Sequence, residues 1–252
     1  MIIKKTPEQV EMMAASGEIL VRCLKMISSK ARAGATTAEL DSAAERFIRS
    51  QGAEPAFKGY RGFPGSICAS PNSMVVHGIP DDYQLKRGDL LSIDIGVIKD
   101  GWVSDAAMTV PIGSVAPEAQ KLLDVTKGSL FAGVEQMRPG NRLGDVSAAI
   151  QRAVEIEGLS IIRTLVGHGI GRDMHEEPQV PNFGEPGKGP KLEEGMVLAI
   201  EPMVNAGGPL VRMGDDGWAV FSEDGSLAAH FEFTVAVTSD GPRILTPWHD
   251  AD

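Results

Sequence analysis

Three carboxylates stand inside apolar, strand-like stretches: Asp94 in LLSIDIGV, Glu201 in MVLAIEPMV and Glu232 in AAHFEFTVAV. Burying an ionised acid in a sheet costs on the order of several kcal/mol unless a positive group lies beside it. Lysine and arginine are nearly absent from these stretches, whereas Asp105 follows Asp94 by eleven residues and His168 lies among glycines in VGHGIG. Four carboxylates and one imidazole are the donor set of a site for one or two divalent metal ions.

The pattern around Asp94 predicts how the first two acids lie relative to each other. Polar and apolar residues alternate there, so Asp94 lies on the polar face of a strand. Asp100-Gly101 is typical of a two-residue hairpin turn, which would pair Asp94 with Ala107 and leave Asp105 as its diagonal neighbour on the same face. A three-residue turn would lose this geometry unless a β-bulge restored it.

The last acid-bearing stretch has the same alternation. His230, Glu232 and Thr234 fall on one face of a predicted strand, and phenylalanine and valine fall on the other. A hairpin of antiparallel strands together with helices predicts an α/β or α+β protein and disfavours an all-parallel sheet.

The chain contains an internal repeat. The predicted helices run from Thr6 to about Ala33, from Thr36 or Thr37 to Gly52, from about Pro117 to Met137, and through SAAIQRAVEI to Gly158. Each helix pair leads to a glycine-flanked histidine, His77 or His168, and then to two acid-bearing strands. Any one acid alone could be a surface residue on an edge strand, but acids on matching strands of both repeats argue against this for the set. Two halves of about 6–112 and 114–240, related by a pseudo-twofold axis, would form a site in the crevice between them.

The length and the net charge of the chain limit which classes of function are possible. The 252 residues contain no linker-like segment, which predicts a single domain over residues 1–252. A formal net charge of -10 argues against a nucleic acid or an anionic membrane as the main partner. No apolar run reaches the roughly 18 residues of a membrane span, and the start of the chain is not a signal peptide, so we expect a cytoplasmic protein. Only Cys23 and Cys68 occur, and we expect both to be free thiols.

Five ordered segments together resemble the type I methionine aminopeptidases, the cytosolic enzymes that remove initiator methionine. The segments are HGIP, DIGVIKDGWVSDAAMTV, GHGIGRDMHEEPQVPN, GMVLAIEPM and FEFT, and the resemblance spans nearly the whole chain. It implies the pseudosymmetric "pita-bread" α/β fold, a mixed or antiparallel sheet covered by helices. It also implies a substrate that is an N-terminal methionyl peptide or a nascent chain, met at the ribosome or free, and a monomeric enzyme.

The resemblance implies a role for each site residue. Two divalent metal ions would be held by Asp94, Asp105, His168, Glu201 and Glu232, with Asp105 and Glu232 bridging. The oxygen-rich donor set favours Mn, Fe(II), Co or Zn without choosing among them. Glu201 would also shuttle a proton, His175 would donate to the scissile carbonyl or its oxyanion, and His77 would act near the leaving nitrogen. The methionine pocket would be lined by Tyr60, Phe63, Cys68, Met174 and Trp218.

Three positions depart from the family pattern. Phe233 replaces a usual histidine after the last ligand, His230 replaces a usual glutamine two residues before it, and Met174 replaces a frequent pocket aromatic. None is a metal ligand, so these departures concern the support of Glu232 and the shape of the pocket. The alternatives are an X-Pro aminopeptidase or dipeptidase on the same fold, and a catalytically silent relative that binds nascent chains or ribosomes. The silent relative would be marked by lost ligands, and all five are present.

Overall fold

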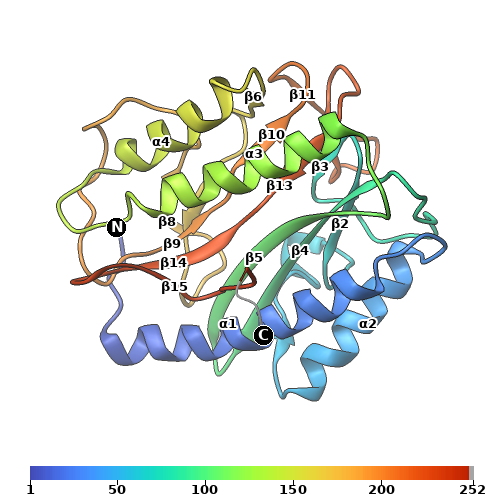
Figure 1. Ribbon diagram of the computed structural model, residues 1–252. Helices are drawn as coiled ribbons and strands as arrows, with labels where there is room; N and C mark the ends of the chain where they lie inside the picture. Colours follow the sequence, from blue (N-terminus) through green and yellow to red (C-terminus); the bar gives the residue numbers. More distant parts are fainter. Residues whose placement is uncertain (250–252) are drawn as a thin grey trace.

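The computed structural model describes residues 1–249, in two similar halves that each place two helices on antiparallel strands. In Figure 1 the first helix pair runs along the lower edge, the second pair along the upper edge, and the strands lie between them. The helices are α1 (Pro7–Lys30), α2 (Thr37–Ser50), α3 (Pro117–Val134) and α4 (Leu143–Glu155), and one 3-10 turn, η1, covers Tyr60–Gly62. Helix α1 packs on β4 and β5, and α3 packs on α4, β13 and β10.

The strands form four antiparallel sheets. The first contains β1 (Glu54–Pro55), β4 (Leu90–Lys99), β2 (Cys68–Pro71) and β5 (Trp102–Pro111), and the five-stranded sheet has the order β15 (Gly241–Ile244), β14 (Phe233–Thr238), β9 (Val197–Ile200), β7 (Gly167–Gly169) and β8 (Glu176–Val180). The smaller sheets are β13 (Ala228–His230), β10 (Met203–Asn205) and β6 (Ser160–Ile161), and β11 (Val211–Met213), β12 (Val220–Ser222) and β3 (Met74–Val76).

Local sequence signals account for the helix starts. Thr6 caps α1 by accepting a hydrogen bond from the Gln9 backbone N–H at 3.3 Å, and the Gln9 side chain accepts one in return at 3.0 Å. Thr36 and Glu39 form the same reciprocal pair at the start of α2. The predicted end of α1 near Ala33 is three residues too late, because the backbone leaves the helical region at Ala31.

The hairpin of β4 and β5 has the predicted register. Asp94 pairs with Ala107 across a two-residue turn in which Asp100 and Gly101 both have positive φ, 51° and 75°. A turn with φ > 0 at both central residues matches the twist of the strands, so the hairpin continues without a bulge. The apolar face of β4 is fully buried in the main core, and Asp94 and Asp105 therefore point away from the helices.

The prediction that Glu201 and Glu232 lie within continuous strands is wrong. Glu201 lies in the break between β9 and β10, and Glu232 lies in the break between β13 and β14. The physical reason is that the Glu232 backbone N–H donates to the carbonyl of Ala107 in the other half at 2.9 Å, and Pro202 has no N–H to continue the ladder. Both strands consequently pass from one sheet to another at the two acids.

Two threonines join the halves along this seam. The Thr234 hydroxyl donates to the Asp105 carbonyl at 2.7 Å and accepts from the Asp105 N–H at 3.0 Å. The Thr109 hydroxyl makes the same pair of bonds with the backbone of His230, each at 2.9 Å. These buried bonds hold β5 against β13 and β14, so the acids of the two halves face one another.

Candidate active site

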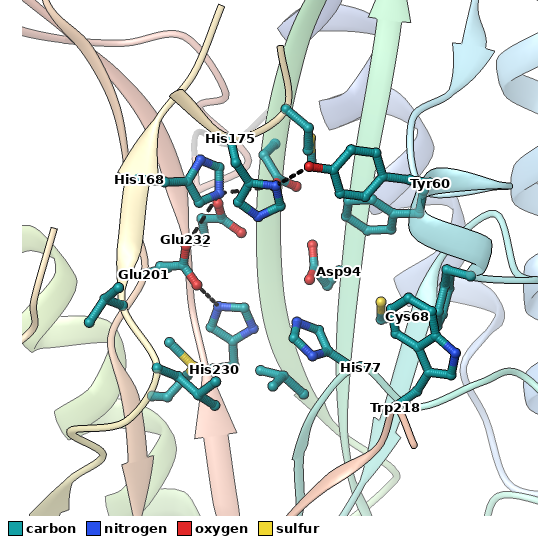
Figure 2. A pocket seen from close by; sticks show the side chains of 18 of the residues that line it. Tyr60, Cys68, His77, Asp94, His168, His175, Glu201, Trp218, His230 and Glu232 are labelled. Carbon is teal, nitrogen blue, oxygen red and sulfur yellow. Dashed lines mark hydrogen bonds and ion pairs between the residues drawn. The ribbon is translucent and has the colours of Figure 1, made fainter. Parts of the chain in front are cut away.

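A cavity of about 310 Å³ lies between the two halves, and all twelve residues that the sequence assigned to the site line it. Figure 2 shows His168, Glu201, Glu232 and His230 on one side of the cavity and Cys68 and Trp218 on the other, with Asp94 and His77 between them. The described residues of the wall are Phe57, Tyr60, Arg61, Phe63, Cys68, Val76, His77, Asp94, Asp105, Thr164, Leu165, Val166, His168, Met174, His175, Glu201, Met203, Trp218, His230 and Glu232.

The polar side brings together a potential metal-binding group. Ligand atoms of Asp105, His168 and Glu232 all lie within 4.8 Å of one another. The Nε2 atom of His168 is 3.5 Å from Glu201 Oε1 and 3.9 Å from Asp105 Oδ2. Its Nδ1 atom lies 2.9 Å from the Gly169 carbonyl oxygen, so Nδ1 carries the proton and the Nε2 lone pair faces the acids. This is the orientation of a histidine that ligates a metal through Nε2.

The carboxylates have unsatisfied oxygens. Asp94 Oδ1, Asp105 Oδ1 and Glu232 Oε1 are buried without a hydrogen-bond partner, and the ion pairs of Asp105 and Glu201 among the described residues are with histidines. Burial raises the pKa of Asp94 to about 7. Burial, and then the charges of neighbouring acids, raises the pKa values of Asp105, Glu201 and Glu232 well above their usual range. Divalent cations would satisfy these oxygens and offset the repulsion, so the residues fit a metal centre.

Two further histidines border this group. The ring of His175 lies 4.2 Å from that of His168, centroid to centroid, and burial lowers the pKa of His175 to about 4. His77 has a left-handed backbone conformation with φ 60°, and burial lowers its pKa. Both imidazoles are therefore neutral at neutral pH, and a neutral imidazole can donate one hydrogen bond and accept another.

The opposite side of the cavity is apolar. Phe63 and Trp218 meet edge to face with ring centroids 5.1 Å apart, and Cys68 pairs with Asp94 across β2 and β4. Phe57 and Met174 of this wall pack directly on Gly96, since a Cβ atom there would lie 2.7 Å from the ring of Phe57 and 3.1 Å from Met174 Cε. The cavity therefore has an apolar wall next to the acids.

Two of the departures from the family pattern, Phe233 and His230, have different local surroundings. Phe233 stacks on Trp248 with ring centroids 4.7 Å apart, and the Trp248 indole N–H donates to the Glu232 carbonyl at 2.8 Å. An aromatic cluster thus supports the backbone of Glu232. His230 is buried, neither of its ring nitrogens has a hydrogen-bond partner within residues 1–249, and its Nε2 is 3.7 Å from Glu201 Oε2. Burial lowers the pKa of His230 to about 3, with a further effect of His77.

Sequence reasoning assigned no site role to eight of the lining residues. They are Phe57, Arg61, Val76, Thr164, Leu165, Val166, Met203 and His230. Val76 directly precedes His77, and Met203 follows Glu201 by two residues. Their closeness in sequence to predicted site residues could have identified them. Phe57 carries no such signal, because it reaches the pocket through the pairing of β1 with β4.

Known proteins resemble this chain along nearly its whole length. The model of metallopeptidase family M24 matches residues 11–239. A methionine aminopeptidase of Clostridium perfringens is 52% identical over 246 residues, which cover 98% of this chain and 99% of that protein. The chain belongs to the methionine aminopeptidases of metallopeptidase family M24. As a methionine aminopeptidase family member it is an enzyme, a hydrolase, and the resemblance found in the sequence is confirmed.

Solved structures confirm the fold class. The crystal structure of a methionine aminopeptidase from Rickettsia prowazekii matches with a TM-score of 0.96 at 42% identity, over 98% of this chain and 100% of that one. The prolidase from Pyrococcus horikoshii matches with a TM-score of 0.79 at 22% identity, over 97% of this chain and 63% of that one, which concerns the fold alone. No helix within residues 1–249 of this methionine aminopeptidase family member is long and apolar enough to cross a membrane.

Proposed function

We propose that the protein removes the N-terminal methionine of peptides and nascent chains with a small second residue, and that it uses two divalent metal ions. Their ligands would be Asp94, Asp105, His168, Glu201 and Glu232, the set that the family resemblance implies. The observation that carries this proposal is the set of buried, unpartnered carboxylate oxygens beside an apolar pocket. When bound, the ions supply Lewis acidity toward the scissile carbonyl and lower the pKa of a water.

The protein's own residues would orient the substrate and move protons. The methionine side chain fits the apolar wall of Tyr60, Phe63, Cys68, Met174 and Trp218, and one missing or misplaced methylene costs ~1–3 kcal/mol there. This wall selects an unbranched apolar first residue.

The proton steps fall to three side chains. Glu201 takes the proton of the attacking water and passes it to the leaving nitrogen, and its two carboxylate oxygens lie 3.5 Å from His168 Nε2 and 3.7 Å from His230 Nε2. His175 donates to the carbonyl oxygen as charge develops on it, and His77 interacts at the leaving nitrogen. Each of these side chains lines the cavity.

The wider setting is part of the same proposal. Residues 1–252 would act as a single catalytic domain, because both halves contribute to one cavity. We propose a monomer that acts in the cytoplasm on nascent chains, at the ribosome or after release. The net charge of -10 supports the absence of a nucleic-acid partner.

Metal titration of chelator-treated protein tests this function directly. Co, Mn, Fe(II) and Zn are added in turn, bound metal is measured, and methionine release from Met-Ala-Ser is followed. We expect up to two equivalents of metal and turnover that tracks loading. Leu-Ala-Ser should be cleaved much more slowly, norleucine in place of methionine should be accepted, and an X-Pro dipeptide should not be a substrate. Full loading without release of methionine would instead favour a catalytically silent relative, and preferred cleavage of the X-Pro dipeptide would favour a prolidase-type activity.

A further inference from the structure

We propose that Tyr60 is a positioning residue: its hydroxyl selects the tautomer of His175 that presents Nε2–H to the cavity. The proposal rests on the proposed function, in which His175 donates a hydrogen bond to the carbonyl oxygen. It assigns to Tyr60 a task beyond that of an apolar pocket wall.

The contact crosses the mouth of the cavity. Tyr60 belongs to η1 in the first half, and His175 immediately precedes β8 in the second half. The Tyr60 Oη atom lies 2.8 Å from His175 Nδ1, and the two rings stack at 5.4 Å with 23° between their planes. Figure 2 shows the Tyr60 hydroxyl directed at His175, with Cys68 and Trp218 farther along the wall. The hydroxyl is therefore turned toward a histidine instead of toward the apolar end of the pocket.

The direction of this hydrogen bond decides what His175 can do. A neutral imidazole has one N–H and one acceptor nitrogen. If the phenol donates to Nδ1, the proton of His175 stays on Nε2, and Nε2–H can donate to a substrate oxygen. If Nδ1–H donates to the phenol, Nε2 is only an acceptor and cannot support a developing oxyanion.

The neighbouring histidine has the opposite arrangement. The Gly169 carbonyl lies 2.9 Å from Nδ1 of His168 and leaves its Nε2 lone pair facing the acids. His175 contacts the rings of both His168 and Tyr60, with ring centroids 4.2 Å and 5.4 Å away. A carbonyl oxygen on one ring and a hydroxyl on the other thus give two adjacent imidazoles different tasks, acceptor and donor.

Hydrogen bonds on both sides of Tyr60 hold the backbone of η1. The Tyr60 N–H donates to the Phe57 carbonyl at 2.9 Å, the Phe63 N–H donates to the Tyr60 carbonyl at 2.9 Å, and Gly59 takes the left-handed conformation with φ 85°. The Arg61 guanidinium lies 5.3 Å from the centre of the Tyr60 ring. The phenol therefore projects from a hydrogen-bonded turn. A side chain that orients another side chain needs such a rigid support.

Tyr60→Phe tests the proposal, with Tyr83→Phe as the matched control. The chain has two tyrosines, and the Tyr83 hydroxyl bonds to Asp89, away from the cavity. In Tyr60→Phe we expect kcat to fall about tenfold with KM little changed. This is the effect of losing one hydrogen bond that stabilises only the transition state. In a His175→Ala background the same substitution should have no further effect on kcat. Tyr83→Phe should leave both constants unchanged.

A second measurement does not depend on activity. Long-range ¹H–¹⁵N spectra of histidine side chains in the metal-free protein distinguish the two tautomers. Wild-type His175 should carry its proton on Nε2, and Tyr60→Phe should shift it toward a mixture. A proton on Nδ1 in the wild type, or a rise in KM with kcat unchanged in Tyr60→Phe, would overturn the proposal. If the tautomer shifts as expected but His175→Ala leaves kcat unchanged, the proposed function of His175 fails instead.

Discussion

Replacing Lys5 by methionine is expected to destabilise the loop that carries His175. The Lys5 Nζ atom lies 2.6 Å from Glu176 Oε2, and the two side chains are only 2% and 4% exposed. Glu176 directly follows His175, and its second oxygen accepts from the Arg172 N–H at 2.9 Å. One buried ion pair therefore fastens the N-terminal segment to the loop beside the cavity.

The size of the effect follows from burial. Removing one partner of a buried pair leaves an uncompensated charge and costs ~3–5 kcal/mol, a large share of the ~5–15 kcal/mol of a typical domain. Methionine keeps the volume of the lysine stem, so the change isolates the charge. Combining Lys5→Met with Glu176→Gln removes both charges and should cost less than Lys5→Met alone. We also expect kcat to fall by about tenfold, because a small displacement of His175 misplaces its donor.

Urea unfolding of the metal-free protein, followed by tryptophan fluorescence, measures the free energy of unfolding. Lys4→Met is the matched control: the Lys4–Glu193 pair is as close, 2.8 Å, but its side chains are 53% and 51% exposed. That variant should unfold at the urea concentration of the wild type, since exposed pairs contribute little. If Lys4→Met and Lys5→Met lower the midpoint equally, or the double variant is the least stable, the reasoning about the buried pair is refuted.

Asp105→Asn should lose one equivalent of metal by elemental analysis and nearly all peptidase activity, and a fully loaded, active variant would contradict a dinuclear centre. His175→Ala should lower kcat by ~100-fold or more with metal content kept, whereas His168→Ala should lose metal; equal metal loss in the two would refute this division of roles. Gly96→Ala should lower kcat/KM for Met-Ala-Ser by about tenfold or more, because the added methyl group would displace Phe57 and Met174 in the pocket wall, and an unchanged value would show that these side chains adjust without affecting substrate binding. Burial raises the pKa of Cys23 to about 12, so iodoacetamide should leave it unmodified at pH 8 until the protein is unfolded, as mass spectrometry would detect.

The sequence by itself determined the features that depend on short segments. The capping pairs at Thr6 and Thr36 and the turn at Asp100-Gly101 form between residues at most three apart, and their chemistry can be read directly from the chain. The register of the β4–β5 hairpin follows from that turn, so the relation of Asp94 to Asp105 was predictable. The family motifs likewise identified all four acids and three of the four histidines that line the cavity, and His230 is the histidine to which they gave no role.

Only the tertiary structure decided how the two halves meet. Glu232 interrupts its strand because its N–H bonds to Ala107, more than a hundred residues earlier in the chain. Tyr60 reaches His175, and Lys5 reaches Glu176, over similar or greater separations. No local periodicity encodes these contacts, since each depends on the packing of complete elements from both ends of the chain. The sequence thus specifies which groups are present, and the packing of the halves determines which of them touch.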